Sequence, residues 1–163
     1  MPITQVSLVP IVSKDLDTIL EIETSAENAP YIGQWERDRH QKAIADANIA
    51  HLKIVSNNKI VGYLILIGIT NPDRSIQLKR IAIAQKRTGF GRQAIRLVKA
   101  MVFNQFQAHR FWLDVMVHNT KAYALYLSEG FVEEGILRQS LKRQDRFIDL
   151  RVMSILEQEY KIN

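Results

Sequence analysis

The stretch QKRTGFGRQAI, residues 85–95, decides how the rest of this chain is interpreted. It begins with polar and basic side chains, continues with two glycines separated by one residue, and passes into a helical pattern. Backbone N–H groups at a helix start lack intrahelical acceptors and carry partial positive charge. Glycines let that backbone approach a bound group closely, and Lys86, Arg87 and Arg92 add cations around it. The stretch therefore predicts a cradle for an anion such as a phosphate or pyrophosphate.

The elements around this stretch follow from the spacing of apolar residues. Residues 75–84 alternate and predict a strand, whereas apolar residues from 91 onward follow the 3, 4, 7 spacing of a helix. The other predicted strands are 4–11, two joined by a tight turn within 50–70, 109–117 and two within 131–158; the other predicted helices are 13–26, 36–46 and 119–130. Strands gather before the central helix and alternate with helices after it. This order indicates an α+β fold with a mixed, mostly antiparallel sheet flanked by helices.

Composition and charge narrow the class of protein. The chain has 163 residues, 47% of them hydrophobic, and we find no repeat or linker, so we expect a single domain over 1–163. A net charge of +5 favours an anionic partner. The absence of cysteine excludes disulfides, thiolate metal sites and a cysteine nucleophile. With no signal-peptide pattern and only about half a membrane span at 60–69, we expect a cytoplasmic protein without membrane segment or metal.

Two nucleotide-binding motifs compete for the glycine-rich stretch. The phosphate loop G-x-x-x-x-G-K-[ST] is absent, but Gly89, Gly91 and Ala94 match the dinucleotide fingerprint, with Asp114 about 20 residues further on. We exclude a dinucleotide fold because a predicted hairpin and two helices precede the motif and only one further strand–helix pair follows. A glycine-rich turn with solvated charges remains the structural alternative.

Two motifs resemble the GNAT superfamily of N-acetyltransferases. LKRIAIAQKRTGFGRQAIRLV, residues 78–98, resembles the acetyl-coenzyme A signature, a strand followed by [QR]-x-x-G-x-[GA] and a helix, with Lys86 where glutamine or arginine is usual. HNTKAYALYLSEGFVEEG, residues 118–135, resembles the N-x-x-A-x-x-L-Y-x-x-x-G-F element of the family. Within the superfamily, YIGQW (31–35) and HRFWLDV (109–115) resemble the branch that contains the ribosomal-protein-alanine acetyltransferases.

The resemblance implies a binding site for acetyl-CoA. Strands 75–84 and 109–117 are implied to be parallel neighbours that splay apart and form the cofactor cleft. The residues implied to bind the cofactor are Ile81, Ala82, Ile83, Lys86, Arg87, Thr88, Gly89, Phe90, Gly91, Arg92 and Asn119. Tyr126 is implied to be catalytic as the donor of a proton to the departing thiolate; the reference pKa is about 10 for a phenol and about 8.5 for a thiol. Core packing for Tyr126 and a helix-capping role for Asn119 are the alternatives.

The sequence indicates less clearly which residues bind the acceptor amine. Tyr31 and Trp35 are candidate walls of the acceptor pocket, and ordinary core packing is the alternative for both. Gln77 stands where many relatives carry a glutamate that receives the amine proton, and glutamine cannot accept it. The remaining candidate bases are Glu21, Glu23, Asp114, His118 and water. A basic group near the end of the chain either attracts an acidic acceptor or is a solvated turn: Arg138, Lys142, Arg143 and Arg146.

The expected activity is acetyl transfer from acetyl-CoA to a primary amine, of a peptide N-terminus or a small molecule, by direct attack in a ternary complex. The protein is then an acyltransferase that is a monomer or a homodimer. The alternative is a CoA-binding module of the same fold with lost or regulatory activity, for which Gln77 is the only support. Nucleic acid is not an expected partner, because no recognition helix or basic stripe with interleaved aromatics is present.

Overall fold

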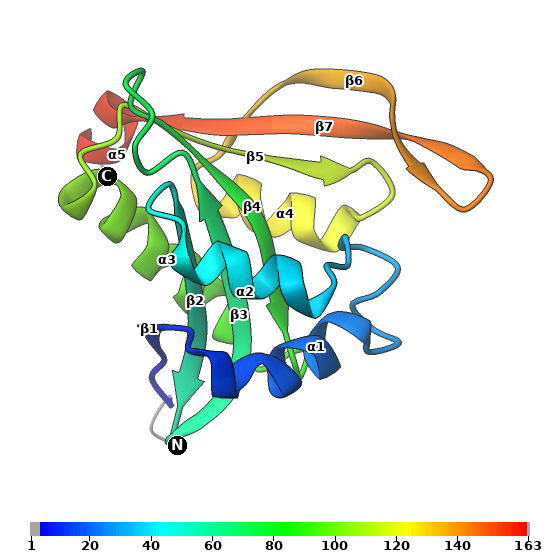
Figure 1. The fold of residues 1–163 in the computed structure, drawn as a ribbon. Helices are drawn as coiled ribbons and strands as arrows, with labels where there is room; N and C mark the ends of the chain where they lie inside the picture. Colours follow the sequence, from blue (N-terminus) through cyan, green and yellow to red (C-terminus); the bar gives the residue numbers. More distant parts are fainter. Residues whose placement is uncertain (1–3, 163) are drawn as a thin grey trace.

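A single seven-stranded sheet organises the chain, and the computed structural model describes residues 4–162 of it (Figure 1). The strand order is β1-β2-β3-β4-β5-β7-β6. The strands are β1 (Ser7–Pro10), β2 (Ile49–Ser56), β3 (Lys59–Ile67), β4 (Ser75–Ile83), β5 (Arg110–Met116), β6 (Val132–Arg143) and β7 (Arg146–Leu156). All neighbours are antiparallel except β4 and β5, which confirms the predicted mixed sheet with one parallel pair.

The parallel pair is short. β4 and β5 pair at Ser75 with Arg110, Ile76 with Phe111, and Gln77 with Trp112. Beyond these positions the two strands diverge, and β5, β7 and β6 turn away from β2, β3 and β4 (Figure 1). The sheet therefore opens between the later parts of β4 and β5, as the resemblance implied.

Helices cover both faces of the sheet (Figure 1). The helices are α1 (Leu16–Thr24), α2 (Arg37–Ala45), α3 (Phe90–Ala100), α4 (Thr120–Ser128) and α5 (Glu157–Ile162). The apolar stripe of α3 and the inner side of α4 bury the larger core, which includes Ile95, Val98 and Tyr126. On the opposite face α1 and α2 bury a second core with Ile19 and Tyr63. A buried aliphatic side chain contributes about 1.5–3 kcal/mol, so both layers hold the sheet in place.

A β-bulge in β4 changes which side chains face which core. Ile65 pairs with Arg80 and Leu66 pairs with Leu78, so Lys79 is the extra residue. Ile76 and Leu78 belong to the core under α3, but after the bulge Ala82 belongs to the core under α1 and α2. One inserted residue exchanges the two faces of a strand. The simple alternation expected for 75–84 missed this exchange.

The predicted order of strands and helices is otherwise confirmed, with small differences at the ends. The helix that begins after the glycines continues from α3 into a π-helical turn, Met101–Gln105. Helix α5 was not expected, and its Glu159 side chain accepts from the Leu156 N–H at 2.8 Å. No helix in the described range 4–162 is long and apolar enough to cross a membrane.

Candidate active site

The opening between β4 and β5 presents unpaired backbone from β4. The Ala84 N–H donates to the Val61 carbonyl of β3. Because the direction of the N–H and C=O groups alternates along a strand, those of Ile81 and Ile83 point away from β3 and into the opening. The side-chain amide of Asn28 donates to the Ile83 carbonyl at 3.1 Å and to the Ile22 carbonyl at 3.0 Å. Asn28 thereby ties the α1–α2 connection to the end of β4, a contact that the sequence did not indicate. The N–H groups of Ile81 and Ile83 face the opening.

The loop after β4 forms the predicted turn into α3. Gly89 is the N-cap with φ of +79°, and no atom lies within 4 Å of an added Cβ, so backbone conformation rather than space favours glycine there. The Thr88 hydroxyl donates to the Gln85 carbonyl at 3.1 Å and accepts from the Phe90 N–H at 3.4 Å. A Cβ on Gly91 would lie 3.7 Å from Ile83 Cγ1. The first turn of α3 therefore lies beside the end of β4, with its amides directed outward as a cradle requires.

The three cations of this stretch have different surroundings. Lys86 donates to the Asn28 side-chain oxygen, and burial lowers its pKa. Arg92 donates to Ser128 at 2.9 Å and pairs with Glu129. Arg87 is exposed, with φ of +61°. Of the expected phosphate cations, Arg87 extends into solvent, while Lys86 and Arg92 are held by side chains of other elements.

Glu129 is a residue that sequence reasoning missed. Its side chain is 4% exposed at the end of α4 and pairs with Arg92, with Arg96 at 3.0 Å and with Lys99 at 3.5 Å. Burial raises the pKa of Glu129, but hydrogen bonds from Arg96 and Arg92 outweigh this and hold the pKa below its usual value. Three cations around one carboxylate leave an excess of positive charge beside the cradle. Glu129 immediately precedes the G-F of the second motif, but nothing in the sequence pairs it with α3.

Tyr126 lies on the inner face of α4 and is 7% exposed. Its ring packs against Phe131 with the centroids 5.6 Å apart. Its hydroxyl has no hydrogen-bond partner anywhere in residues 4–162. Burial and the charge of Asp114 raise the pKa of Tyr126 far above that of a free phenol, so the hydroxyl stays protonated near neutral pH. The ring of Tyr126 thus packs in the core, while its hydroxyl is free to donate a proton.

Asp114 lies beside Gln77, the residue that replaces the expected glutamate. Gln77 Nε2 donates to Asp114 Oδ2 at 3.5 Å. Burial raises the pKa of Asp114, and the charge of Lys79 opposes that rise. The charge of Asp114 also contributes to the raised pKa of Tyr126. A carboxylate therefore lies at the opening between the strands, carried by β5 rather than β4.

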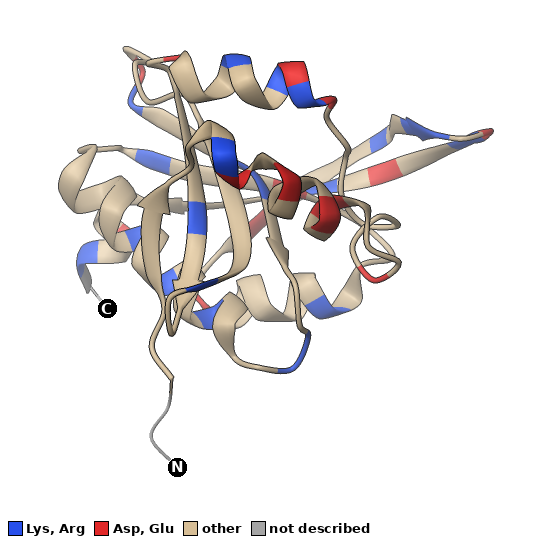
Figure 2. Ribbon diagram, turned by 60° about the horizontal axis from the view of Figure 1, so that its bottom comes forward, with Lys and Arg blue, Asp and Glu red and all other residues tan. Residues whose placement is uncertain are grey.

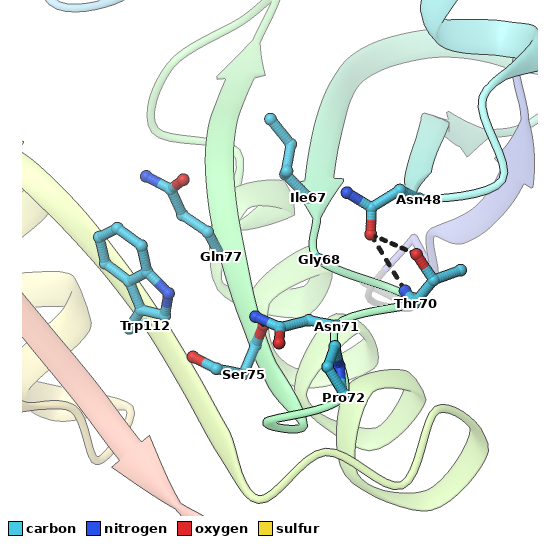
Figure 3. A pocket seen from close by; sticks show the side chains of 9 residues that line it. All are labelled: Asn48, Ile67, Gly68, Thr70, Asn71, Pro72, Ser75, Gln77 and Trp112. Atoms are coloured by element: carbon cyan, nitrogen blue, oxygen red, sulfur yellow. Dashed lines mark hydrogen bonds between the residues drawn. The ribbon is translucent and has the colours of Figure 1, made fainter.

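A cavity of about 400 Å³ begins at Gln77 (Figure 3). It extends from the last paired position of the parallel strands toward the ends of β2 and β3. Its lining residues are polar or apolar but uncharged: Asn48, Ile67, Gly68, Thr70, Asn71, Pro72, Ser75, Gln77 and Trp112. Asp114 does not line the cavity, but Gln77, which does, contacts it. The cavity is large enough for a small acceptor or one end of a longer one.

The connection between α1 and α2 covers the other side of the opening. Tyr31 is 44% exposed, and its ring centroid lies 5.9 Å from that of His118. His118 precedes Asn119, the N-cap of α4, whose Oδ1 accepts from the Ala122 N–H at 3.3 Å. Tyr31 thus lies at the surface near the start of α4, where an acceptor can reach it. The N-cap role of Asn119 is present, and it leaves the Asn119 side-chain amide N–H groups available.

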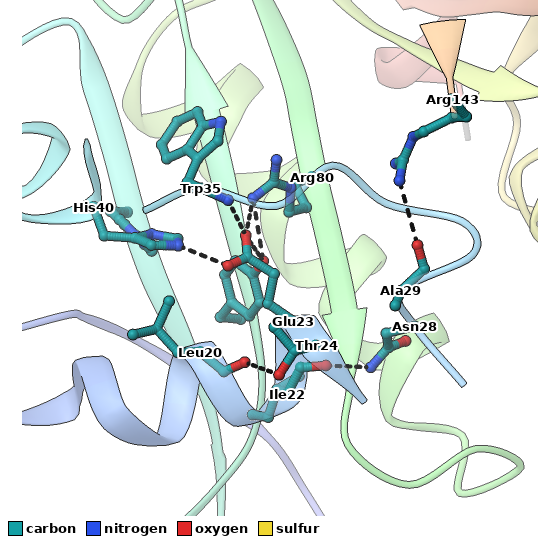
Figure 4. A network of polar contacts seen from close by, with 12 residues as sticks. Leu20, Ile22, Glu23, Thr24, Asn28, Ala29, Trp35, His40, Arg80 and Arg143 are labelled. Atoms are coloured by element: carbon teal, nitrogen blue, oxygen red, sulfur yellow. Dashed lines mark hydrogen bonds and ion pairs between the residues drawn. The ribbon is translucent and has the colours of Figure 1, made fainter. Parts of the chain in front are cut away.

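Trp35 and Glu23 belong to a buried polar network instead (Figure 4). Glu23 is fully buried and accepts from the Trp35 N–H and the Tyr63 hydroxyl, both at 3.1 Å, and from Arg80. His40 Nε2 lies 3.1 Å from Glu23 Oε2. Trp35 is 7% exposed, with the Arg80 guanidinium 5.0 Å from its ring centroid.

These contacts argue against Glu23 as the acceptor of the amine proton, because Arg80 and two further donors occupy its Oε1 and His40 contacts its Oε2. They place Trp35 in the core under α1 and α2, where its contact with an acceptor stays a prediction. Among residues 4–162, no group of three or more His, Cys, Asp or Glu side chains is arranged to hold a metal ion.

Comparison with known proteins agrees with the motifs. Residues 16–131 match the family described as Acetyltransferase (GNAT) family. The chain belongs to this family. A curated relative, the spermidine N(1)-acetyltransferase of Vibrio cholerae serotype O1, is 32% identical over 106 residues. That match covers 64% of this chain and 61% of the relative, so it spans less than two thirds of the relative's length.

Solved structures of the same kind of enzyme cover nearly the whole chain. A complex of Vibrio cholerae spermidine N-acetyltransferase with CoA and spermine has a TM-score of 0.86, 28% identity, and coverage of 98% of this chain and 99% of that chain. A chimera of that enzyme and hSSAT has a TM-score of 0.88, 27% identity, and coverage of 98% and 100%. These relatives acetylate polyamines, so the finer resemblance to the ribosomal-protein-alanine branch is not supported.

Proposed function

We propose that this protein is a single-domain N-acetyltransferase that moves the acetyl group of acetyl-CoA to a primary amine. The observation that carries the proposal is the opening between β4 and β5. The glycine turn into α3 and the free backbone of β4 border it, and the Tyr126 hydroxyl on α4 lies within the influence of the charge of Asp114. Membership of the GNAT family, and the CoA bound to a similar structure, support acetyl-CoA as the donor.

In this proposal the cofactor lies along the opening. The first-turn amides of α3, from Gly89 to Arg92, hold the pyrophosphate, and Arg87 closes over it from solvent. The pantetheine arm pairs with Ile81 and with the N–H of Ile83, while Asn28 keeps the Ile83 carbonyl. Asn119 contacts the arm through its remaining amide N–H groups. These assignments keep most of the residues that the sequence motifs indicated. They give no direct contact to Ala82, whose peptide groups face β3, or to Lys86 and Thr88, which contact Asn28 and Gln85.

The reaction needs two proton movements. The amine nitrogen attacks the thioester carbonyl carbon, the C–S bond breaks, and the thiolate takes the proton of the Tyr126 hydroxyl. Backbone N–H groups of β4 in the opening stabilise the charge that develops on the carbonyl oxygen. The proton lost by the amine passes to Asp114, directly or through water held by Gln77. Asp114 thus supplies the carboxylate that Gln77 lacks.

A CoA-binding module without activity remains the second candidate. The absence of a carboxylate at Gln77 favours it, and Asp114 beside Gln77 argues against it. Both candidates bind CoA, and only one of them releases thiol from acetyl-CoA in the presence of an amine.

Thermal shift measurements test the cradle first, with acetyl-CoA, CoA, NADH and ATP compared at matched salt. A ligand at 100 times its Kd adds about 2.7 kcal/mol of stability, on the order of 5–10 °C for a domain of this size. We expect shifts with acetyl-CoA and CoA that Gly91→Glu removes and Gln41→Glu, an equal charge change on exposed α2, preserves. A shift with NADH alone would contradict the proposal and favour the dinucleotide fingerprint.

Thiol release from acetyl-CoA then separates enzyme from binding module, and the chain has no cysteine to interfere. Asp114→Asn should lower kcat/KM at least tenfold. In the parent protein kcat/KM should rise with pH through a pKa above the usual aspartate value, because the base must be ionised. Binding of CoA without turnover of any amine would favour the module.

A further inference from the structure

Arg143 ends β6 with a guanidinium that no carboxylate in the described part of the chain neutralises. The side chain is half-buried, and its Nη1 donates to the Ala29 carbonyl at 3.4 Å, as Figure 4 shows. No Asp or Glu oxygen lies within 4 Å of it among residues 4–162. Burial and the charge of Arg80 both lower the pKa of Arg143, so a neighbouring cation adds to the cost of its charge. A partly desolvated arginine without a carboxylate is costly unless a ligand supplies one.

The contact with Ala29 places this guanidinium at the mouth of the active site. Ala29 follows Asn28, whose side chain binds the Ile83 carbonyl in the opening between β4 and β5. Two residues further on, Tyr31 packs against His118, which precedes α4. Arg143 therefore reaches the connection that covers the opening, near the end of β4.

The acceptor route offers few carboxylates to a polycation, and the one beside Gln77 is Asp114. No Asp or Glu lines the cavity that begins at Gln77. Lys79 is exposed on the bulge of β4, and the nearby Glu134 is already paired with Arg110 at 2.5 Å. Figure 2 shows further Lys and Arg along the outer part of the β6–β7 hairpin, with some Asp or Glu between them. A triamine would need several carboxylates that no cation already balances.

We propose that Arg143 binds a carboxylate of the acceptor, so that the acceptor is an amine carrying an acidic group rather than a polyamine. The planar fork of arginine pairs with a carboxylate through two parallel hydrogen bonds, which fixes both the distance and the direction of the bound group. The substrate class thus differs from that of the spermidine-acetylating relatives. This inference rests on the proposed acetyltransferase function.

Matched acceptors test the inference, because each pair differs only in one carboxylate. The first pair is the amidated dipeptides Ala-Glu and Ala-Gln, and the second is alanine and alaninamide; spermidine is the polycation. Calorimetry on the CoA-saturated protein measures Kd without requiring turnover, and thiol release measures kcat/KM. In at least one pair, the acceptor with the carboxylate should have a Kd at least tenfold lower than that of its amide counterpart. Spermidine should bind more weakly than that carboxylate-bearing acceptor.

Variants of the hairpin assign the effect to one side chain. Arg143→Gln keeps a donor for the Ala29 carbonyl but removes the charge, so the tenfold preference for the acid should disappear. Arg143→Glu should reverse the preference toward spermidine. Lys142→Gln removes the same charge from the neighbouring position, where the ammonium lies 6.0 Å from the Phe147 ring centroid, and should keep the preference. Melting temperatures confirm that each variant is folded.

The results separate the two proposals. Tighter binding of spermidine than of every acid, or equal loss in Lys142→Gln and Arg143→Gln, overturns the role of Arg143 and leaves the acetyltransferase proposal intact. Arg143-dependent binding of an acid without thiol release from any amine supports the anion site and overturns the catalytic proposal.

Discussion

Arg80 and Arg143 lie close enough to influence each other electrostatically, yet the protein treats them in opposite ways. Arg80 is 6% exposed and pairs with the buried carboxylate of Glu23. Arg143 is half-buried and has one backbone carbonyl. Removing one partner of a buried pair costs far more than removing an unpaired surface charge. The comparison therefore separates a cation that stabilises the fold from a cation available to a ligand.

The largest expected effect is the loss of the carboxylate in the buried network. Glu23→Gln leaves Arg80 buried without a counter-charge, so we expect unfolding to become about 3–5 kcal/mol easier, with a melting temperature on the order of 10 °C lower. Chemical denaturation measures this. Glu21→Gln, on the exposed side of the same helix, should change stability by less than about 0.5 kcal/mol. A loss below about 1 kcal/mol in Glu23→Gln would show that the pair is not essential to the fold.

Two buried tyrosines show the same difference between a side chain that is paired within the fold and one that is not. The Tyr63 hydroxyl donates to Glu23, whereas the Tyr126 hydroxyl has no partner among residues 4–162. Tyr126→Phe should lower kcat by about 100-fold, at the lower end of general-acid effects, with little change in stability. Tyr63→Phe should lower stability by about 1–2 kcal/mol and leave kcat largely unchanged. Equal activity in the two variants would contradict the assignment of Tyr126 as the proton donor.

The pH dependence of stability probes the network through His51. Burial, with the charges of His40 and Arg80, lowers the pKa of His51 to about 4. The unfolded chain binds a proton at this histidine below about pH 6.5, while the folded chain does not until about pH 4. Stability should therefore fall by about 2 kcal/mol between pH 7 and pH 4.5. Denaturation across this range measures the slope, and His51→Gln should flatten it; an unchanged slope would assign the effect to other groups.

The smallest expected effect on stability is at the unpaired arginine. Arg143→Gln should change the free energy of unfolding by less than about 0.5 kcal/mol, because it removes a charge that no carboxylate within residues 4–162 balances. Arg80→Gln should lower the free energy of unfolding by several kcal/mol, because it leaves the buried carboxylate of Glu23 without the guanidinium that pairs with it. Denaturation of both variants in one buffer gives the comparison. A loss of more than about 2 kcal/mol in Arg143→Gln would assign this arginine a structural role.

Local patterns were sufficient to predict the order of elements and the family. Apolar alternation marked the strands, and 3.6-residue periodicity marked the helix after the glycines. The two motifs around Gly91 and Tyr126 predicted the parallel pair that opens between β4 and β5, because both depend on residues close together in the sequence. The unexpected helix α5 lies at the end of the chain, where six residues give too short a pattern to recognise.

The tertiary structure alone decided how charges are paired. The bulge at Lys79 turns Arg80 away from the core under α3 and toward Glu23, 57 residues earlier in the chain. The partners of Glu129 lie on α3, and the contact of Arg143 with Ala29 spans 114 residues. No local pattern encodes a one-residue register shift or such distant pairings. The sequence by itself therefore determined the fold and the glycine turn into α3, whereas long-range packing decided which cations are paired with carboxylates.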